Sequence, residues 1–150
     1  MRFKVGLVSR LDEPRALEVA RNLARQLRKK RIGVVSELDL AKSGRLGGGV
    51  FLNELRADLI VTVGGDGTVL KTAMTIPEQE TPILAVNMGR RGYLTEVDPT
   101  KVMAAIDSFR KGNYTLEKRA KIAVDMNGSH IVDALNELVV SSAAQPRCWT

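Results

Sequence analysis

The sequence contains very few cysteines, histidines and aromatic residues, and these shortages exclude several kinds of site. Cys148 is the single cysteine, so the chain can form no internal disulfide and no metal centre built from several cysteines. His130 is the single histidine, and it falls in a predicted strand, where we expect it to be packed or exposed rather than catalytic. No apolar run reaches membrane-spanning length, and the N-terminus begins with a charged strand pattern instead of a signal peptide. We therefore expect a soluble, cytoplasmic protein with no membrane partner.

Negative charge is also in short supply, because the net charge is +6. Such an excess favours an anionic partner, for example a nucleotide or another phosphate compound. Much of the excess lies on one predicted helix and its end, at Arg21, Arg25, Arg28, Lys29, Lys30 and Arg31. No aromatic residues alternate with these charges, as they do where nucleic-acid bases stack. A solvated basic face is therefore favoured over a nucleic-acid site.

Strand and helix patterns alternate over residues 1–112. Strands are predicted at residues 3–9, 33–35, 58–63 and 82–86, and helices after Pro14, at residues 69–74 and from Asp98-Pro99 to a stop at Gly112. The glycine-rich, basic stretch 41–49 is expected to be a mobile loop. Alternation of this kind is typical of an α/β domain with a parallel, Rossmann-like sheet.

The pattern changes in residues 113–150. Asn127-Gly128 stands between the strand candidates 121–126 and 129–132, which is the strongest short signal for a β-hairpin. A further strand is predicted at residues 138–142. Two or three strands do not readily bury a face of their own. We therefore expect the first strands of an antiparallel, β-rich domain that is incomplete in this chain.

The segment Gly64-Gly65-Asp66-Gly67-Thr68 follows the most apolar strand and precedes a helix. Glycines let the backbone approach a ligand closely, and exposed N–H groups at a helix N-terminus bind phosphate. Ligands of open α/β sheets bind at this end of the strands. Asp66 would repel phosphate, so it needs another role: to hold Mg²⁺, to accept a proton from an attacking hydroxyl, or merely to cap the helix through Thr68.

Two more segments carry groups suited to a nucleotide. Residues 87–96 begin with Asn87 after the next strand, offer two glycines for backbone access, and place Tyr93 either beside a base or in the core. Asn136 and Glu137 put an amide next to a carboxylate, which can donate to and accept from sugar hydroxyls.

The glycine-rich loop is neither a Walker A sequence nor the dinucleotide-binding Gly-x-Gly-x-x-Gly. It resembles the Gly-Gly-Asp-Gly-Thr signature of a superfamily that contains NAD kinases, diacylglycerol and sphingosine kinases and, more distantly, phosphofructokinases. Residues 87–95 are similar to the NAD kinase pattern Asn-x-Gly-x-x-Gly-Phe-Leu-Thr, with Tyr93 in place of phenylalanine. Asn136-Glu137 is similar to the Asn-Glu motif that opens the second domain of that family. Together the three segments resemble an NAD kinase N-terminal domain followed by the start of its β-rich domain.

This resemblance implies an NAD kinase that phosphorylates the 2′-hydroxyl of NAD's adenosine ribose to form NADP, with Mg²⁺ and either ATP or polyphosphate as donor. Asp66 would act on the hydroxyl, as a base or through a metal. The other residues that the resemblance implicates are Gly65, Gly67 and Thr68 along the phosphoryl path, Asn87 and Tyr93 beside the adenosine, and Asn136 and Glu137 at the ribose hydroxyls. Lys71 would either neutralise phosphate charge or remain a solvated lysine.

Two alternatives stay open at this stage. One is a lipid kinase of the same superfamily, and the other is a non-catalytic nucleotide-binding module. The resemblance also implies homo-oligomers for the full-length enzyme and small-molecule substrates rather than nucleic acid. Nothing after Glu137 is similar to the family's Gly-Ser/Thr-Thr-Ala-Tyr motif, so we expect this chain to be a fragment that lacks part of the NAD pocket.

Overall fold

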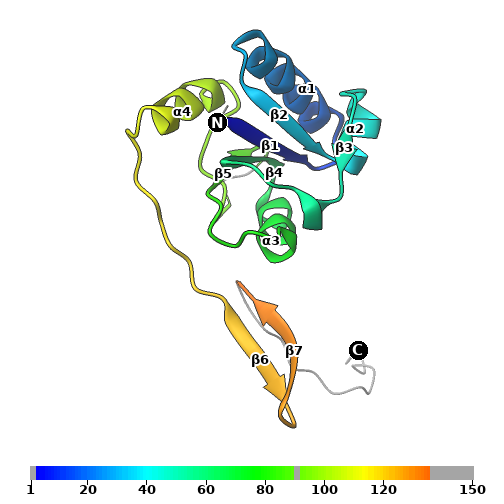
Figure 1. Cartoon of the computed structure of the whole chain (residues 1–150), viewed down its shortest axis with the longest axis vertical. Coiled ribbons are helices and arrows are strands. Elements are labelled where there is room, and N and C mark those ends of the chain that lie inside the picture. Colours follow the sequence, from blue (N-terminus) through cyan, green and yellow to red (C-terminus); the bar gives the residue numbers. More distant parts are fainter. Residues whose placement is uncertain (1–2, 90–91, 136–150) are drawn as a thin grey trace, which may run out of the picture. The chain divides into compact units, whose positions relative to one another are not determined.

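The computed structural model describes residues 3–89 and 92–135, and the chain divides into two units, Met1–Glu117 and Lys118–Thr150 (Figure 1). The elements of the first unit are, in chain order, β1 (Lys4–Ser9), α1 (Pro14–Lys29), β2 (Gly33–Glu37), α2 (Leu38–Gly44), β3 (Gly49–Val50), the 3-10 turn η1 (Leu52–Glu54), β4 (Leu59–Gly64), α3 (Asp66–Thr75), β5 (Ile83–Asn87) and α4 (Val102–Arg110). Among the described residues, no helix is long and apolar enough to cross a bilayer.

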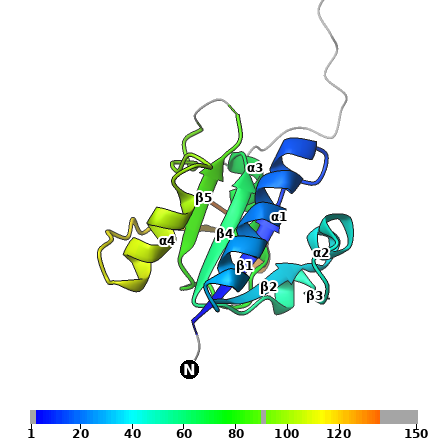
Figure 2. The same ribbon diagram turned by 90° about the horizontal axis from the view of Figure 1, so that it is seen from above.

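The first unit is built on a five-stranded sheet with the order β3-β2-β1-β4-β5 (Figure 2). All neighbouring strands are parallel. The chain runs from β1 outward to β2 and β3, and then returns to the other side of β1 to form β4 and β5. This arrangement confirms the predicted α/β class and places a topological switch point between β1 and β4.

The two faces of this sheet carry separate apolar clusters. On one face, Val5 and Leu7 of β1 pack with buried residues of α1 and α4, among them Leu23 and Ile106. On the other face, Val8 of β1 packs with residues from β4, from η1 and from the end of α3. The strands therefore have apolar residues on both sides, as expected where helices cover both faces.

Helix α1 begins at Pro14 as predicted, and its buried stripe consists of Ala16, Ala20, Leu23, Ala24 and Leu27. Glu13 occupies the N-cap position of this helix but makes no side-chain capping hydrogen bond. Asp12 instead forms a two-bond ion pair with Arg10, at 2.7 and 2.8 Å. This hydrogen bonding lowers the pKa of Asp12 and raises the pKa of Arg10.

The prediction of a loop over residues 41–49 is wrong for its first part, which belongs to helix α2. The Glu37 carboxylate accepts a hydrogen bond from the Leu40 N–H at 3.0 Å, which caps the helix. The side chains of Leu40 and Ala41 are buried in the first unit. Capping and burial thus outweigh the glycine-rich, basic composition that suggested a loop.

Two other helices begin at positions that differ from the prediction. Helix α3 starts at Asp66, with Gly65 alone between it and the end of β4, rather than at residue 69. Helix α4 starts at Val102 rather than at Asp98, because the Asp98 carboxylate accepts hydrogen bonds from the Thr100 N–H and hydroxyl at 2.8 and 2.5 Å. These bonds hold residues 98–100 in a turn and lower the pKa of Asp98. The predicted stop at Gly112 is confirmed by its left-handed φ of 76°.

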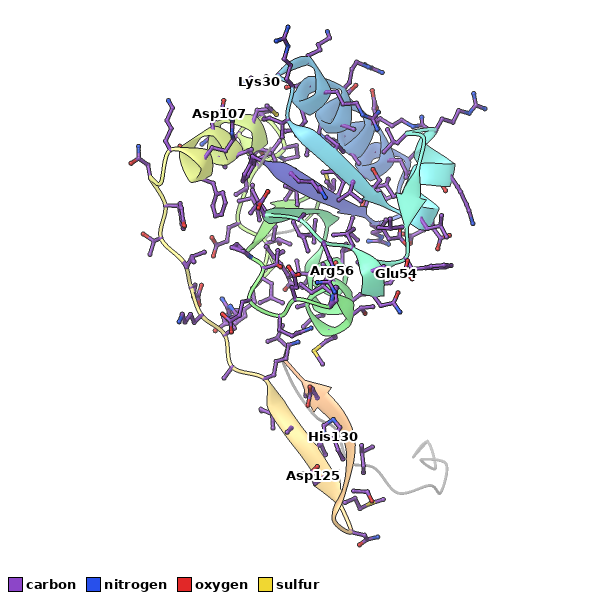
Figure 3. All side chains as sticks on the ribbon, in the orientation of Figure 1. Lys30, Glu54, Arg56, Asp107, Asp125 and His130 are labelled. Carbon is purple, nitrogen blue, oxygen red and sulfur yellow. The ribbon has the colours of Figure 1, made fainter. Side chains whose placement is uncertain are left out.

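The second unit contains an antiparallel pair, β6 (Ile122–Met126) and β7 (Ser129–Ala134). Asn127 and Gly128 join them with φ values of 54° and 77°, which confirms the predicted hairpin turn. His130 lies on β7 with 55% of its side chain exposed and its ring nitrogens 3.3 and 3.5 Å from Asp125 and Asp133 (Figure 3). The strand predicted at residues 138–142 lies outside the described residues.

Candidate functional site

The loop between β4 and α3 opens at the switch point of the sheet. Strand β4 is buried along its whole length and ends at Gly64, and Arg10, which follows β1, donates its backbone N–H to the Val63 carbonyl at 2.9 Å. The carboxyl ends of β1 and β4 therefore meet beside the loop. Crevices at this position in parallel sheets bind ligands.

Three glycines of the loop differ in what surrounds them. A Cβ atom on Gly64 would lie 3.1 Å from the Thr68 Cβ and even nearer to its hydroxyl, so this glycine lets α3 pack closely on β4. A Cβ atom on Gly65 or Gly67 would meet nothing within 4 Å. Packing within the described chain therefore explains Gly64, whereas Gly65 and Gly67 border open space that a ligand can enter.

The backbone N–H groups at this point suit an anion. Gly65 is the N-cap of α3, and its carbonyl accepts from the Thr68 N–H at 3.0 Å. Asp66 and Gly67 fill the first turn, where N–H groups have no partner within a helix. The helix end also carries about half a positive charge. The loop thus combines open access with the donors that phosphate requires.

Asp66 does not cap the helix through Thr68, which was one of the open alternatives. Its carboxylate reaches the segment of residues 87–96, here called the second motif. It accepts hydrogen bonds from the backbone N–H groups of Tyr93 at 2.8 Å and Leu94 at 3.1 Å. A Cβ atom on Gly92 would lie 2.6 Å from the Asp66 carboxyl carbon, so only glycine permits this approach. Asp66 therefore ties residues 92–94 to the start of α3.

The second motif also joins the end of β4 through the backbone. Met88 donates its N–H to the Gly64 carbonyl at 3.1 Å, and the Asn87 side-chain oxygen accepts from the Gly89 N–H at 2.9 Å. Asn87 itself pairs with Gly64 in the β4–β5 register. The structure thus brings Asn87 and the glycine-rich loop together, because β4 and β5 are neighbouring strands.

The remaining candidate residues lie in different settings. Tyr93 is 72% exposed, so the alternative of a core tyrosine is wrong. Lys71 is exposed one turn into α3, while Thr68 packs over Gly64. Asn136 and Glu137 lie outside the described residues. Within the described ranges, no three side chains of His, Cys, Asp or Glu gather to hold a metal ion.

Sequence reasoning gave no role to Gly92 beyond general backbone access, and none to Thr95. Gly92 could have been singled out because it is the second glycine of the motif and stands directly before Tyr93. The Thr95 side chain is buried, and its hydroxyl has no hydrogen-bond partner in the described part of the chain. No pattern in the sequence signals that burial.

Comparison with known proteins identifies similar chains. Residues 49–114 match the family described as ATP-NAD kinase N-terminal domain. The NAD kinase of Methanothermobacter thermautotrophicus is 37% identical over 140 residues, covering 92% of this chain and 49% of the relative. The NAD kinase of Methanopyrus kandleri is 35% identical over 140 residues, covering 91% of this chain and 49% of the relative. The chain thus spans about half the length of the curated relatives that it matches.

Solved structures share the fold. Yeast NADH kinase complexed with NADH superposes with a TM-score of 0.72 at 21% identity, over 90% of this chain and 47% of the other. An enzyme from Archaeoglobus fulgidus, an NAD kinase in complex with ATP, superposes with a TM-score of 0.56 at 18% identity, over 85% of this chain and 45% of the other. At these identities the likeness shows the fold alone.

Proposed function

We propose that this chain belongs to the NAD kinase family and forms the phosphate-binding half of an enzyme that converts NAD to NADP, because residues 49–114 match the ATP-NAD kinase N-terminal domain and the chain is 37% identical to an NAD kinase over 140 residues. The observation that carries the proposal is the loop at the switch point of the sheet, where Gly65 and Gly67 border open space beside an anchored carboxylate. The donor is ATP or polyphosphate, and the acceptor is the 2′-hydroxyl of the adenosine ribose. One structural neighbour is a complex with NADH and the other is a complex with ATP, which supports a nicotinamide dinucleotide and ATP as the ligands.

The anchoring of Asp66 removes a difficulty for phosphate binding. A free carboxylate among the loop amides would repel phosphate, but both oxygens of Asp66 point to the N–H groups of Tyr93 and Leu94. Hydrogen bonds to a carboxylate are charge-assisted and fix its position. The amides of the first turn of α3 therefore stay available to the phosphoryl oxygens, while Asp66 is held at one side.

In the proposed reaction the 2′-hydroxyl oxygen attacks the terminal phosphorus of the donor, the bond to the leaving phosphate breaks, and the hydroxyl proton passes to Asp66. Each carboxylate oxygen has two lone pairs and accepts one hydrogen bond from a backbone N–H group, so a lone pair remains to take this proton. Because the carboxylate is already fixed, little ordering is needed during the reaction.

Mg²⁺ is compatible with this donor set. Asp66 supplies one carboxylate, and Mg²⁺ in kinase sites is commonly held by one or two carboxylates together with substrate phosphates and waters. Asp66 would be the residue to hold it. When bound, the ion would offset the charge that develops on the transferred group.

The other residues retain the roles that the family resemblance implies. Thr68 and the glycines line the phosphoryl path, Lys71 contributes positive charge near it, and the exposed Tyr93 offers a flat surface beside the adenosine. Asn136 and Glu137 hold the ribose hydroxyls. Asn136→Ala and Glu137→Ala therefore weaken NAD binding, since a buried hydroxyl left without its hydrogen-bond partner costs ~1–3 kcal/mol of binding free energy.

The β-rich domain begins at residue 113. The full-length enzyme is a cytoplasmic homo-oligomer, and nucleic acid and membranes are not its partners.

Titration of the 150-residue chain with NAD, NADP, ATP and a glycerophosphate lipid head group tests the proposal. We expect ATP, NAD or NADP to shift the backbone amide signals of residues 65–68, because their phosphates bind there. The lipid head group is the control for a lipid kinase. Binding of that head group in preference to every nucleotide would overturn the proposal, and so would nucleotide binding that leaves residues 65–68 unperturbed.

A further inference from the structure

A concentration of positively charged side chains lies on the first unit, outside the glycine-rich loop. An open hollow of about 470 Å³ forms where α1 meets the end of α2. Its charged lining consists of Arg21, Arg25, Arg28, Lys29 and Arg45. None of these residues belongs to the loop or to the turn after β5, and Figure 2 shows α2 beside β3 at the edge of the sheet. The hollow is therefore distinct from the site proposed above.

Two of these arginines are held in place by backbone carbonyls. Arg21 donates from Nε to the Gly44 carbonyl at 3.1 Å and from Nη2 to the Ser43 carbonyl at 2.6 Å. Arg28 donates from Nη2 to the Leu46 carbonyl at 2.7 Å. A guanidinium group has five N–H donors, so each arginine keeps further donors. Their side chains are thus ordered before any ligand arrives, which reduces the entropy lost on binding.

The cations of the hollow have no acidic partner in the described part of the chain. Within residues 3–89 and 92–135, none of the ion pairs joins a residue of this lining to a carboxylate. Arg25 donates to the neutral Asn22 side chain, at 3.1 Å. The C-terminal ends of α1 and α2 supply about half a negative charge each. Five cations therefore face roughly one compensating charge, and a multivalent anion would relieve their mutual repulsion.

The lining indicates the class of ligand. It includes no acidic side chain, and no aromatic ring on which a base could stack. Arginine forks match the oxygens of phosphate, and a hollow of this size lies in the range of small-molecule sites, ~300–1,000 Å³. We propose that this hollow binds a compact anion that carries several phosphate groups, independently of the loop at residues 65–68.

Amide chemical shifts of the full 150-residue chain during titration with inorganic triphosphate test this site. We expect saturable shifts at residues 21–29 and 44–46. The double variant Arg25→Gln/Arg45→Gln weakens that binding at least tenfold. The control Lys101→Gln/Lys111→Gln removes the same charge from the two ends of α4 and leaves the affinity within twofold.

Both substitutions in the double variant fall on exposed residues. The single variant Lys29→Gln is a smaller change, and comparison of its amide spectrum with that of the parent chain checks that the fold is kept. Shifts confined to residues 65–68 would overturn the inference, since the loop alone would then bind triphosphate. An equal loss in the α4 control would also overturn it, because the effect would be one of net charge. Tight binding of a short single-stranded oligonucleotide that triphosphate cannot displace would assign the hollow to nucleic acid instead.

Discussion

The Cα of Gly92 lies so near the Asp66 carboxylate that a Cβ atom there would stand 2.6 Å from the carboxyl carbon. This approach lets Asp66 accept the N–H groups of Tyr93 and Leu94, which follow Gly92 directly. Asp66 and Tyr93 are 27 residues apart in the sequence, so these hydrogen bonds join the glycine-rich loop and the segment after β5 into one site. The contact assigns Asp66 a positioning role in addition to its proposed role in catalysis.

Gly92→Ala tests the positioning role without removing the carboxylate. The added methyl group pushes Asp66 away from both amides, so the amide signals of Tyr93 and Leu94 shift, and turnover in a chain of full family length falls ~10- to 100-fold. Gly89→Ala is the structural control, because a Cβ atom there meets nothing within 4 Å. It should leave both amide signals in place. Unchanged amide signals of Tyr93 and Leu94 in Gly92→Ala would contradict the positioning role of Asp66.

Gly67→Ala and Gly64→Ala should separate ligand access from packing. Gly67 lies in the first turn of α3 beside open space, so alanine keeps or raises stability, by up to ~1 kcal/mol, yet weakens ATP binding. Gly64 touches Thr68, so alanine lowers stability by ~1–3 kcal/mol. Chemical denaturation and ATP titration of both variants provide the measurements. Full ATP binding by a stable Gly67→Ala chain would remove the case for close backbone approach at this position.

Thr62→Val addresses a buried hydroxyl that has no partner in the described part of the chain. Valine has nearly the same shape and suits a central strand, so the free energy of unfolding should stay constant or rise by up to ~1 kcal/mol. The matched control is Thr72→Val, because the Thr72 hydroxyl donates to the Thr68 carbonyl at 2.7 Å. That variant should lose ~1 kcal/mol. A destabilised Thr62→Val would point to a bound water or another partner at this hydroxyl.

Asp107 makes stability depend on pH in the acid range. Lys30 donates a hydrogen bond to its carboxylate at 2.6 Å, which links α1 to α4 and lowers the pKa of Asp107 (Figure 3). A lowered pKa stabilises the fold above the ordinary carboxyl pKa of about 4, and this contribution is lost as pH falls through the lowered value.

The contribution is small because both side chains are partly exposed, ~0.2–1 kcal/mol. Asp107→Asn should therefore reduce the free energy of unfolding at pH 7 by that amount and have no comparable effect at pH 2. Denaturation curves at both pH values provide the measurement. An equal loss at both would mean that packing, not charge, explains the effect.

Much of the fold follows from local patterns. The continuous apolar run of β4 and the Asn127-Gly128 turn predicted their elements because each depends on neighbouring residues alone. Helix α2 was missed because its stability comes from the Glu37 cap and from burial of Leu40, and these outweigh its local composition.

The site was predictable in its parts and not in its connection. The glycine pattern indicated a phosphate loop, whereas the position of Asn87 beside it follows from the pairing of β4 with β5 in the structure. The bonds from Tyr93 and Leu94 to Asp66 depend on how the chain returns after β5, which no spacing reveals. For the same reason the anchoring of Arg21 by α2 carbonyls was not foreseen.

The most direct test of the central claim is the rate of NADP formation by Asp66→Asn in a chain of full family length, measured together with NAD affinity. Asparagine keeps the size of the side chain and one acceptor for the loop, but it cannot take the hydroxyl proton. We predict an NAD dissociation constant within a few-fold of the parent and a turnover number at least ~100-fold lower. Turnover equal to that of the parent would contradict the account, because Asp66 would then be no more than a structural link.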